Sequence, residues 1–102
     1  TYGTAALKSL FEYHADKLIL SVDGIDTEKG LSTFYFQEAD ICKKMIEQSK
    51  TIIIAADYTK IGRVAFSSIT TATAADIIVT NKNSAPDEIS GLKALGIKIV
   101  KV

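Results

Sequence analysis

Two short apolar runs in this chain each end at a charged segment. The run over residues 18–22 leads into an acidic segment, residues 23–26, and the run over residues 51–56 leads into a lysine segment, residues 57–62. Runs of this length with almost no polar residue are typical of strands buried on both faces of a parallel sheet. The carboxyl ends of such strands form the ligand crevice of an open α/β sheet, so the pattern predicts that the two charged segments meet at one site.

Length and charge narrow the classes of protein that the chain can represent. Its 102 residues suffice for a single domain, and 12 basic residues balance 12 acidic ones. Without a net positive charge, the chain is not expected to bind nucleic acid by itself. Its apolar runs are far shorter than the roughly 20 residues of a membrane-spanning helix, so we expect no membrane contact and a cytoplasmic location.

The single cysteine, Cys42, has no second thiol with which to form a disulfide or a metal pair. We therefore expect no structural zinc site. No other metal site and no cofactor is expected either. The chain begins at Thr1, and its first residues already have a helical pattern, so we expect it to be a fragment of a longer protein.

The apolar spacing predicts alternating helices and strands. Short links between them favour a mainly parallel sheet with helical crossovers, which is a Rossmann-like α/β fold of three layers. A helix that begins at Pro86 is expected to be capped by Ser84 or Ala85 and to end at Gly96. Residues 64–69 fit either a short strand or an irregular segment. The other expected elements are helix 3–14, strand 17–22, a long loop 24–37, helix 37–49, strand 51–56, strand 75–80 and strand 97–102.

The acidic segment has two chemical interpretations. Gly24 would let the backbone approach a ligand closely, while Asp23 and Asp26 would accept hydrogen bonds from sugar hydroxyls or act as a general base. Alternatively, the segment is an ordinary turn in which the aspartates bond to their own backbone, and an Asp-Gly pair alone favours this reading.

The lysine segment also allows two interpretations. Lys60 would supply a compact cation for a phosphate or an oxyanion, Thr59 a hydroxyl, and Gly62 an exposed backbone N–H. The alternative is a solvated lysine in a surface loop. Glu38 either lines the same site or stabilises the start of a helix, and Cys42 is expected to be a small buried residue rather than a reactive thiol.

Several short motifs follow one another along nearly the whole chain. They are Ala15-Asp16-Lys17, Gly24-Ile25-Asp26, Gly30-Leu31-Ser32, Glu38-Ala39, Lys43-Lys44-Met45-Ile46, Ala56-Asp57-Tyr58-Thr59-Lys60-Ile61-Gly62 and Ala75-Asp76-Ile77-Ile78-Val79-Thr80. Their order and spacing resemble the carboxy-terminal sensor domain of the DeoR family of bacterial transcriptional regulators.

This resemblance implies a sensor for a phosphorylated sugar or a related metabolite, with a fold like that of the ribose-5-phosphate isomerases. By this resemblance, we also expect the protein to contact operator DNA through a separate amino-terminal helix-turn-helix and to form homo-oligomers. The sequence shows neither the pattern of that helix-turn-helix nor the Gly-Thr-Thr loop of the family. Residues 1–102 therefore resemble the later half of a DeoR-type sensor domain. The ligand-binding residues expected on this basis are Asp23, Gly24, Ile25, Asp26, Gly30, Glu38, Asp57, Thr59, Lys60 and Gly62.

An enzyme is the alternative function. The sequence Asp-Gly-Ile-Asp of the acidic segment also looks like the acidic loop of ribose-5-phosphate isomerases, which use a nearby lysine. In that reading, Asp23 or Asp26 would move a proton between adjacent carbons, and Lys60 would stabilise the enediolate oxygen.

Overall fold

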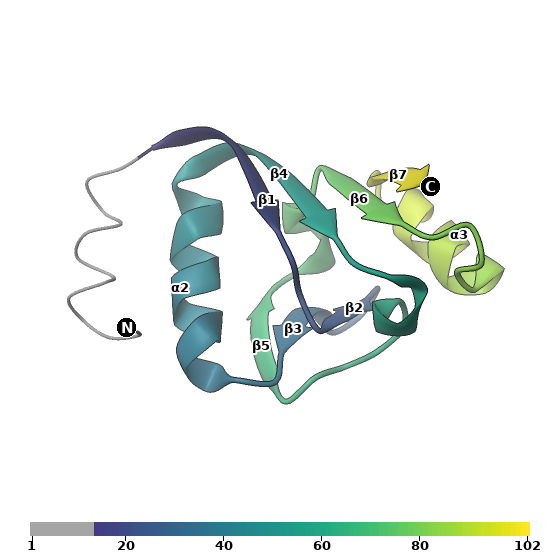
Figure 1. Ribbon diagram of the computed structural model, residues 1–102, viewed down its shortest axis with the longest axis horizontal. Coiled ribbons are helices and arrows are strands. Elements are labelled where there is room, and N and C mark those ends of the chain that lie inside the picture. Colours follow the sequence, from purple (N-terminus) through teal and green to yellow (C-terminus); the bar gives the residue numbers. More distant parts are fainter. Residues whose placement is uncertain (1–13) are drawn as a thin grey trace.

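The computed structural model describes residues 14–102, and the helix expected over residues 3–14 lies outside them except for its last position. Four parallel strands form the main sheet in the order β1-β4-β6-β7 (Figure 1). Isoleucine is the commonest residue of the two central strands, because β-branched side chains pack well on a pleated sheet. The bounds are β1 Ala15–Leu20, β4 Ser49–Ala55, β6 Ile77–Thr80 and β7 Lys98–Lys101. The expected Rossmann-like α/β class with a mainly parallel sheet is confirmed.

A second, antiparallel sheet replaces most of the loop expected over residues 24–37. Its strands are β2 Gly24–Asp26, β3 Gly30–Thr33 and β5 Ser67–Thr70, in the order β2-β3-β5. The expectation of a long loop was wrong. The strands escape recognition in the sequence because they have only three or four residues and are rich in glycine, serine and threonine. Such segments lack the apolar alternation by which a strand is recognised.

Two glycines allow this second sheet to pack closely against its surroundings. A Cβ atom on Gly24 would lie 2.5 Å from the carbonyl oxygen of Arg63, and one on Gly30 would lie 2.2 Å from that of Thr70. Gly30 also has a φ of 80°, a backbone conformation that favours glycine. Both glycines are therefore explained by the packing of the sheet.

The helices and the second sheet cover the same face of the main sheet. Helix α2, Phe36–Glu47, contacts β1 and β4, and helix α3, Pro86–Ala94, contacts β7 (Figure 1). One buried cluster contains Ala39 of α2 and Ile89 of α3 together with Ile25 of β2, Ile54 of β4 and Ile78 of β6. Crossovers that advance in one direction along a parallel sheet fall on one face when all are right-handed, which accounts for this arrangement.

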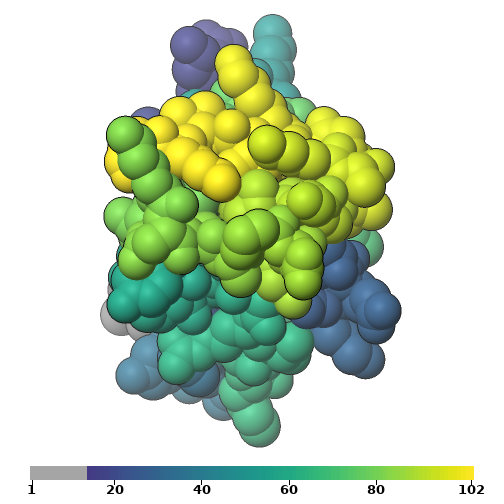
Figure 2. Space-filling model, turned by 90° about the vertical axis from the view of Figure 1, so that its right-hand side faces the viewer, coloured from purple at the N-terminus to yellow at the C-terminus, as the bar shows by residue number. Residues whose placement is uncertain are grey.

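Helix α3 also lies beside the second sheet and the lysine segment. A Cβ atom on Gly91 would lie 2.9 Å from the side chain of Thr27, and one on Gly62 would lie 3.0 Å from that of Glu88. Figure 2 shows this side of the molecule, where the surface of α3 adjoins that of the teal-green segment near residue 60. The lysine segment is therefore held between the two sheets and α3.

The opposite face of the main sheet carries an apolar row. The strand register places Ile19 beside Ile53 and Ile53 beside Ile77. Ile53 and Ile77 are half-buried, whereas Ile19 is 71% exposed. Among residues 14–102, the buried helix residues belong to the cluster on the other face, so no described helix covers this row.

The element boundaries differ slightly from those expected. β1 ends two residues early, at Leu20, and α2 ends at Glu47 rather than at residue 49. Helix α3 begins at Pro86 as expected, but its N-cap, Ala85, provides no side-chain bond. The Ser84 hydroxyl instead lies 3.1 Å from that of Thr80 and donates to the carbonyl of Asn81. Of the two expected caps, Ala85 is therefore the correct one and Ser84 is not.

No helix within residues 14–102 combines the length and the apolar composition that a membrane crossing requires.

Candidate functional site

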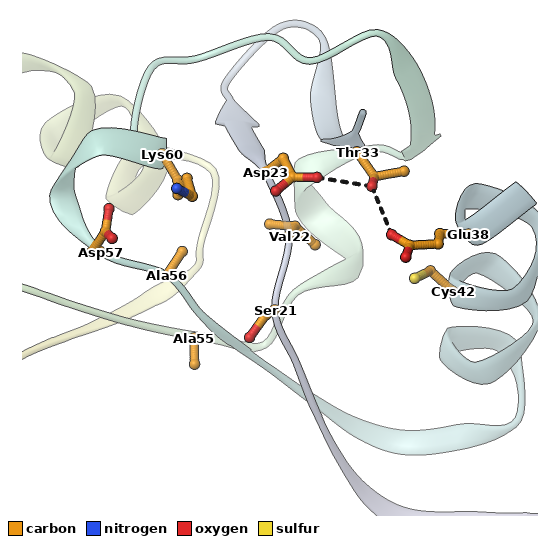
Figure 3. A pocket seen from close by; sticks show the side chains of 10 residues that line it. All are labelled: Ser21, Val22, Asp23, Thr33, Glu38, Cys42, Ala55, Ala56, Asp57 and Lys60. Atoms are coloured by element: carbon orange, nitrogen blue, oxygen red, sulfur yellow. Dashed lines mark hydrogen bonds between the residues drawn. The ribbon is translucent and has the colours of Figure 1, made fainter. Parts of the chain in front are cut away.

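A cavity of about 340 Å³ lies where β1 and β4 end (Figure 3). The two strands are paired neighbours, with Leu20 opposite Ile54, so the segments that follow them start side by side. The start of α2 and the end of β3 complete the wall. The lining residues are Ser21, Val22, Asp23, Thr33, Glu38, Cys42, Ala55, Ala56, Asp57 and Lys60. The expected meeting of the acidic and lysine segments is confirmed for Asp23, Asp57 and Lys60.

Asp23 is fixed in the cavity through one of its two carboxylate oxygens. Oδ2 accepts hydrogen bonds from the Thr33 hydroxyl at 2.9 Å and from the Phe34 backbone N–H at 3.0 Å. The Asp23 backbone N–H donates to the carbonyl of Ser32, which attaches the acidic segment to β3. Among residues 14–102 both side-chain bonds of Asp23 use Oδ2, which leaves Oδ1 available to a donor from a ligand.

Thr33 brings a second carboxylate to the same point. Its hydroxyl lies 3.3 Å from Glu38 Oε2, in addition to its bond with Asp23 (Figure 3). A hydroxyl has one proton, so it donates to one of the two carboxylates at a time. Sequence reasoning missed Thr33, which lies ten residues from Asp23 in an unrecognised strand. The Thr33 hydroxyl thus links the carboxylates of Asp23 and Glu38 at one point of the cavity wall.

The lysine segment begins with a short 3-10 helix, η1, Tyr58–Lys60. Asp57 caps this turn, because its Oδ1 accepts hydrogen bonds from the backbone N–H of Thr59, at 2.9 Å, and from the Thr59 hydroxyl. These bonds, together with Lys60 and Arg63 nearby, hold the pKa of Asp57 below its ordinary value. The Asp57 carboxylate is therefore charged at neutral pH and partly used by the turn.

Lys60 supplies the positive charge of the cavity. Its Nζ lies 3.5 Å from the Thr59 hydroxyl, and the side chain is half-buried. Three carboxylates, from Asp23, Glu38 and Asp57, line the cavity with this single ammonium group. The described part of the cavity thus provides mainly hydrogen-bond acceptors, with one cation that fits a phosphate or another anionic group.

Cys42 also lines the cavity, on the turn of α2 that follows Glu38 (Figure 3). Burial raises the pKa of its thiol, and the neighbouring carboxylates of Glu38 and Asp23 raise it further. The thiol is therefore protonated at neutral pH. The interpretation of Cys42 as a small buried side chain omitted this contact with the cavity, which appears only once α2 is placed beside the strand ends.

The structure places Asp26 at the end of β2, where its side chain caps the turn to β3. Its Oδ2 accepts hydrogen bonds from the backbone N–H groups of Glu28, at 3.0 Å, and Lys29, at 2.8 Å. This geometry agrees with the ordinary-turn interpretation of the second aspartate. Asp26 is not among the residues that line the cavity.

Five other residues that the sequence suggested also lie outside the cavity lining: Gly24, Ile25, Gly30, Thr59 and Gly62. The backbone N–H of Gly62 was expected to be exposed. This expectation was wrong, because the group donates a hydrogen bond to the carbonyl of Ile25 at 2.7 Å. Ile25 itself is fully buried. A part for these five residues in ligand binding stays a prediction.

The sequence matches the family described as "DeoR C terminal sensor domain" over residues 1–82. This chain belongs to that family. The expected resemblance to the DeoR-type sensor domain is thereby confirmed.

Three relatives illustrate the DeoR-type similarity. A protein of Escherichia coli O157:H7, named as a proposed aga operon transcriptional repressor, is 35% identical over 101 residues, 99% of this chain and 38% of its own length. The HTH-type transcriptional repressor GlcR of Bacillus subtilis is 31% identical over 79% of this chain and 31% of its own length. The glycerol-3-phosphate regulon repressor of Escherichia coli K12 is 28% identical over 91% and 36%. The chain thus spans about a third of the length of these DeoR-type relatives.

Proposed function

We propose that this chain is the effector-binding part of a DeoR-type transcriptional repressor and that its ligand is a phosphorylated sugar or polyol. The observation that carries the proposal is the cavity at the ends of β1 and β4, where Asp23 Oδ1 and Lys60 are both available. Asp23 and Glu38 accept hydrogen bonds from ligand hydroxyls, and Lys60 pairs with the phosphate. No bond is made or broken.

Ligand binding acts on DNA through a shift between two conformations of the intact protein. The operator is held by a separate amino-terminal helix-turn-helix, and occupation of the cavity favours the conformation that releases it. Reciprocity follows from linkage, so the operator-bound protein binds the effector more weakly than the free protein does.

A larger sensor domain is the second part of the proposal. No helix within residues 14–102 covers the apolar row of Ile19, Ile53 and Ile77. This observation and the small share of the relatives' length both support additional chain on that face of the sheet. We expect that added part to supply further phosphate contacts, since one ammonium group faces three carboxylates in the described cavity. Homo-oligomerisation and a cytoplasmic location belong to the same proposal.

A sugar-phosphate isomerase is the alternative function. In its favour, Asp23 and Lys60 line one cavity, as a proton carrier and an oxyanion stabiliser would. Against it, Asp26 is used by the β2–β3 turn, and the relatives are named as repressors or regulators. Regulation without turnover therefore has the stronger support.

A thermal-shift screen of the intact protein against aldose, ketose and polyol phosphates tests the proposal. A ligand at 100 times its dissociation constant adds about 2.7 kcal/mol to the free energy of unfolding, which raises the melting temperature measurably. Lys60→Gln is expected to remove the response, whereas Lys43→Gln, on the exposed side of α2, is expected to preserve it.

The same samples distinguish the two functions when they are followed by NMR. Saturable binding without conversion of the sugar phosphate supports the sensor, and turnover supports the isomerase. If no sugar or polyol phosphate shifts the melting temperature of the intact protein, the proposed ligand class is wrong.

A further inference from the structure

Arg63 is the single arginine of this chain, in which all other basic residues are lysines. It directly follows the lysine segment and comes three residues after Lys60. The backbone N–H of Arg63 donates a hydrogen bond to the carbonyl of Lys60 at 3.3 Å, and the side chain of Arg63 is exposed. The two cations therefore leave the same turn at the edge of the cavity.

The side chain of Arg63 is held by an aromatic ring. Its guanidinium lies over the ring of Phe34, with Cζ 5.2 Å from the ring centroid. A cation in this position is attracted by the negative face of the ring. The backbone N–H of Phe34 donates to Asp23 Oδ2 at 3.0 Å, so the ring stands on the residue that fixes Asp23. The Arg63–Phe34 pair thus joins the two chain segments that meet at the cavity.

The charge of Arg63 acts on the cavity, although the side chain is not part of its lining. The hydrogen bonds from Thr59 lower the pKa of the lining residue Asp57, and the charges of Lys60 and Arg63 lower it further. Three carboxylates line the described cavity with one ammonium group. A phosphate beside Lys60 adds negative charge to this lining, so a second cation at the same edge favours its binding.

The donors of Arg63 fit the geometry of a phosphate. Within residues 14–102, the side chain has the contact with Phe34 and no ion pair with a carboxylate. A guanidinium carries five N–H donors in a rigid planar fork, which can bind two phosphate oxygens at once, whereas a lysine ammonium acts as a point charge. An arginine that is held on a ring and has no carboxylate partner in the described chain therefore has its fork available to an oxyanion.

We propose that Arg63 is a second phosphate-binding residue of the ligand site and that the ring of Phe34 positions its guanidinium, an inference that rests on the proposed function. The phosphate lies at the edge of the cavity, where Lys60 and Arg63 leave their common turn. It makes one contact with the ammonium group and a two-point contact with the guanidinium. The hydroxyls of the same ligand then reach Asp23 inside the cavity.

Isothermal titration of the intact protein tests the part of Arg63. The probes are inorganic phosphate and the compound that gives the largest thermal shift in the panel of sugar and polyol phosphates. Arg63→Gln is expected to weaken both by roughly tenfold or more, because charge-assisted hydrogen bonds to the phosphate are lost. Arg63→Lys keeps the charge without the fork and is expected to bind with an affinity between the two. Lys43→Gln, on the exposed side of α2, is the control and should change neither affinity.

A double-mutant cycle tests the part of Phe34. Phe34→Leu removes the ring but keeps the backbone N–H that binds Asp23, and it is expected to weaken the sugar phosphate by roughly two- to fivefold. The same substitution should have no effect in the Arg63→Gln protein, because the ring acts through Arg63. Phe34→Tyr keeps a ring and should keep the affinity, and Phe66→Leu, at a neighbouring aromatic that is 83% exposed, should do the same. If Phe34→Leu weakens binding equally with and without Arg63, the positioning role is wrong.

The outcomes separate this inference from the proposed function. If a sugar or polyol phosphate binds the wild-type protein and Arg63→Gln binds it equally tightly, the effector-binding function stands and this inference is wrong. If no compound of the panel binds the wild-type protein, the proposed function and this inference fall together.

Discussion

Replacing Asp23 by asparagine tests how the cavity recognises a ligand hydroxyl. Two donors, the Thr33 hydroxyl at 2.9 Å and the Phe34 N–H at 3.0 Å, both point at Oδ2. In Asp23→Asn the amide oxygen is expected to take this position, because an amide nitrogen cannot accept these bonds. The NH2 group then occupies the position of Oδ1, which changes an acceptor facing the ligand into a donor.

The expected loss of affinity follows from the strength of a charge-assisted hydrogen bond. Such bonds contribute about 1.5–3 kcal/mol, which corresponds to a rise in dissociation constant of roughly ten to a hundredfold. Isothermal titration of the intact protein with its sugar phosphate measures this change. Thr33 and Phe34 keep their bonds to residue 23, so the melting temperature without ligand should change little.

Asp26→Asn provides the matched comparison within the same segment. Asparagine can accept the bonds from the N–H groups of Glu28 and Lys29 as aspartate does, so the turn is expected to persist and ligand affinity to stay within about twofold. If Asp26→Asn weakens binding as much as Asp23→Asn, or if Asp23→Asn binds normally, the assignment of hydroxyl recognition to Asp23 is wrong.

Three further predictions address the frame of the site. Thr33→Val should reduce the free energy of unfolding by about 1.5–3 kcal/mol in a urea titration, because the buried hydroxyl bonded to charged groups is lost. The control Thr51→Val, in β4, should leave the free energy of unfolding nearly unchanged. Equal effects of the two substitutions would contradict the argument. Gly30→Ala should destabilise the protein by more than about 1 kcal/mol, since residue 30 has positive φ and a Cβ atom would meet the Thr70 carbonyl, and an unchanged melting temperature would refute this. Alkylation of Cys42 by iodoacetamide should require a higher pH than alkylation of a free cysteine, because the raised pKa delays thiolate formation, and bound ligand should slow it; a rate profile like that of free cysteine would contradict the cavity environment.

The sequence was informative about the main sheet and about which strand ends lie together. The apolar runs that became β1 and β4 are long enough to be recognised, and parallel pairing then brings Asp23 and Lys60 to one edge. This inference needed only the direction of the chain and the burial of the strands. It did not depend on the exact end of β1, which lies two residues before the predicted position.

The second sheet and its contribution to the cavity could not be predicted in the same way. Short polar strands are specified by backbone packing, such as the close approach at Gly24 and Gly30, which leaves no periodic pattern in the sequence. Thr33 reaches the cavity only because β3 pairs with β2 and β5. For the same reason, the two aspartates of the acidic segment looked equivalent, although one bonds across to β3 and the other closes a turn.

The Cys42 and Glu38 contacts depended on the placement of α2. Their helical spacing was visible in the sequence, but the face that meets the strand ends follows from the packing of α2 on β1 and β4.

A crystal structure of the intact protein with a bound sugar phosphate tests the central claim most directly. The account predicts a ligand hydroxyl within hydrogen-bond distance of Asp23 Oδ1 and the phosphate beside Lys60 Nζ, in the cavity at the ends of β1 and β4. A ligand bound at another surface, with Asp23 and Lys60 contacting only solvent, would contradict it.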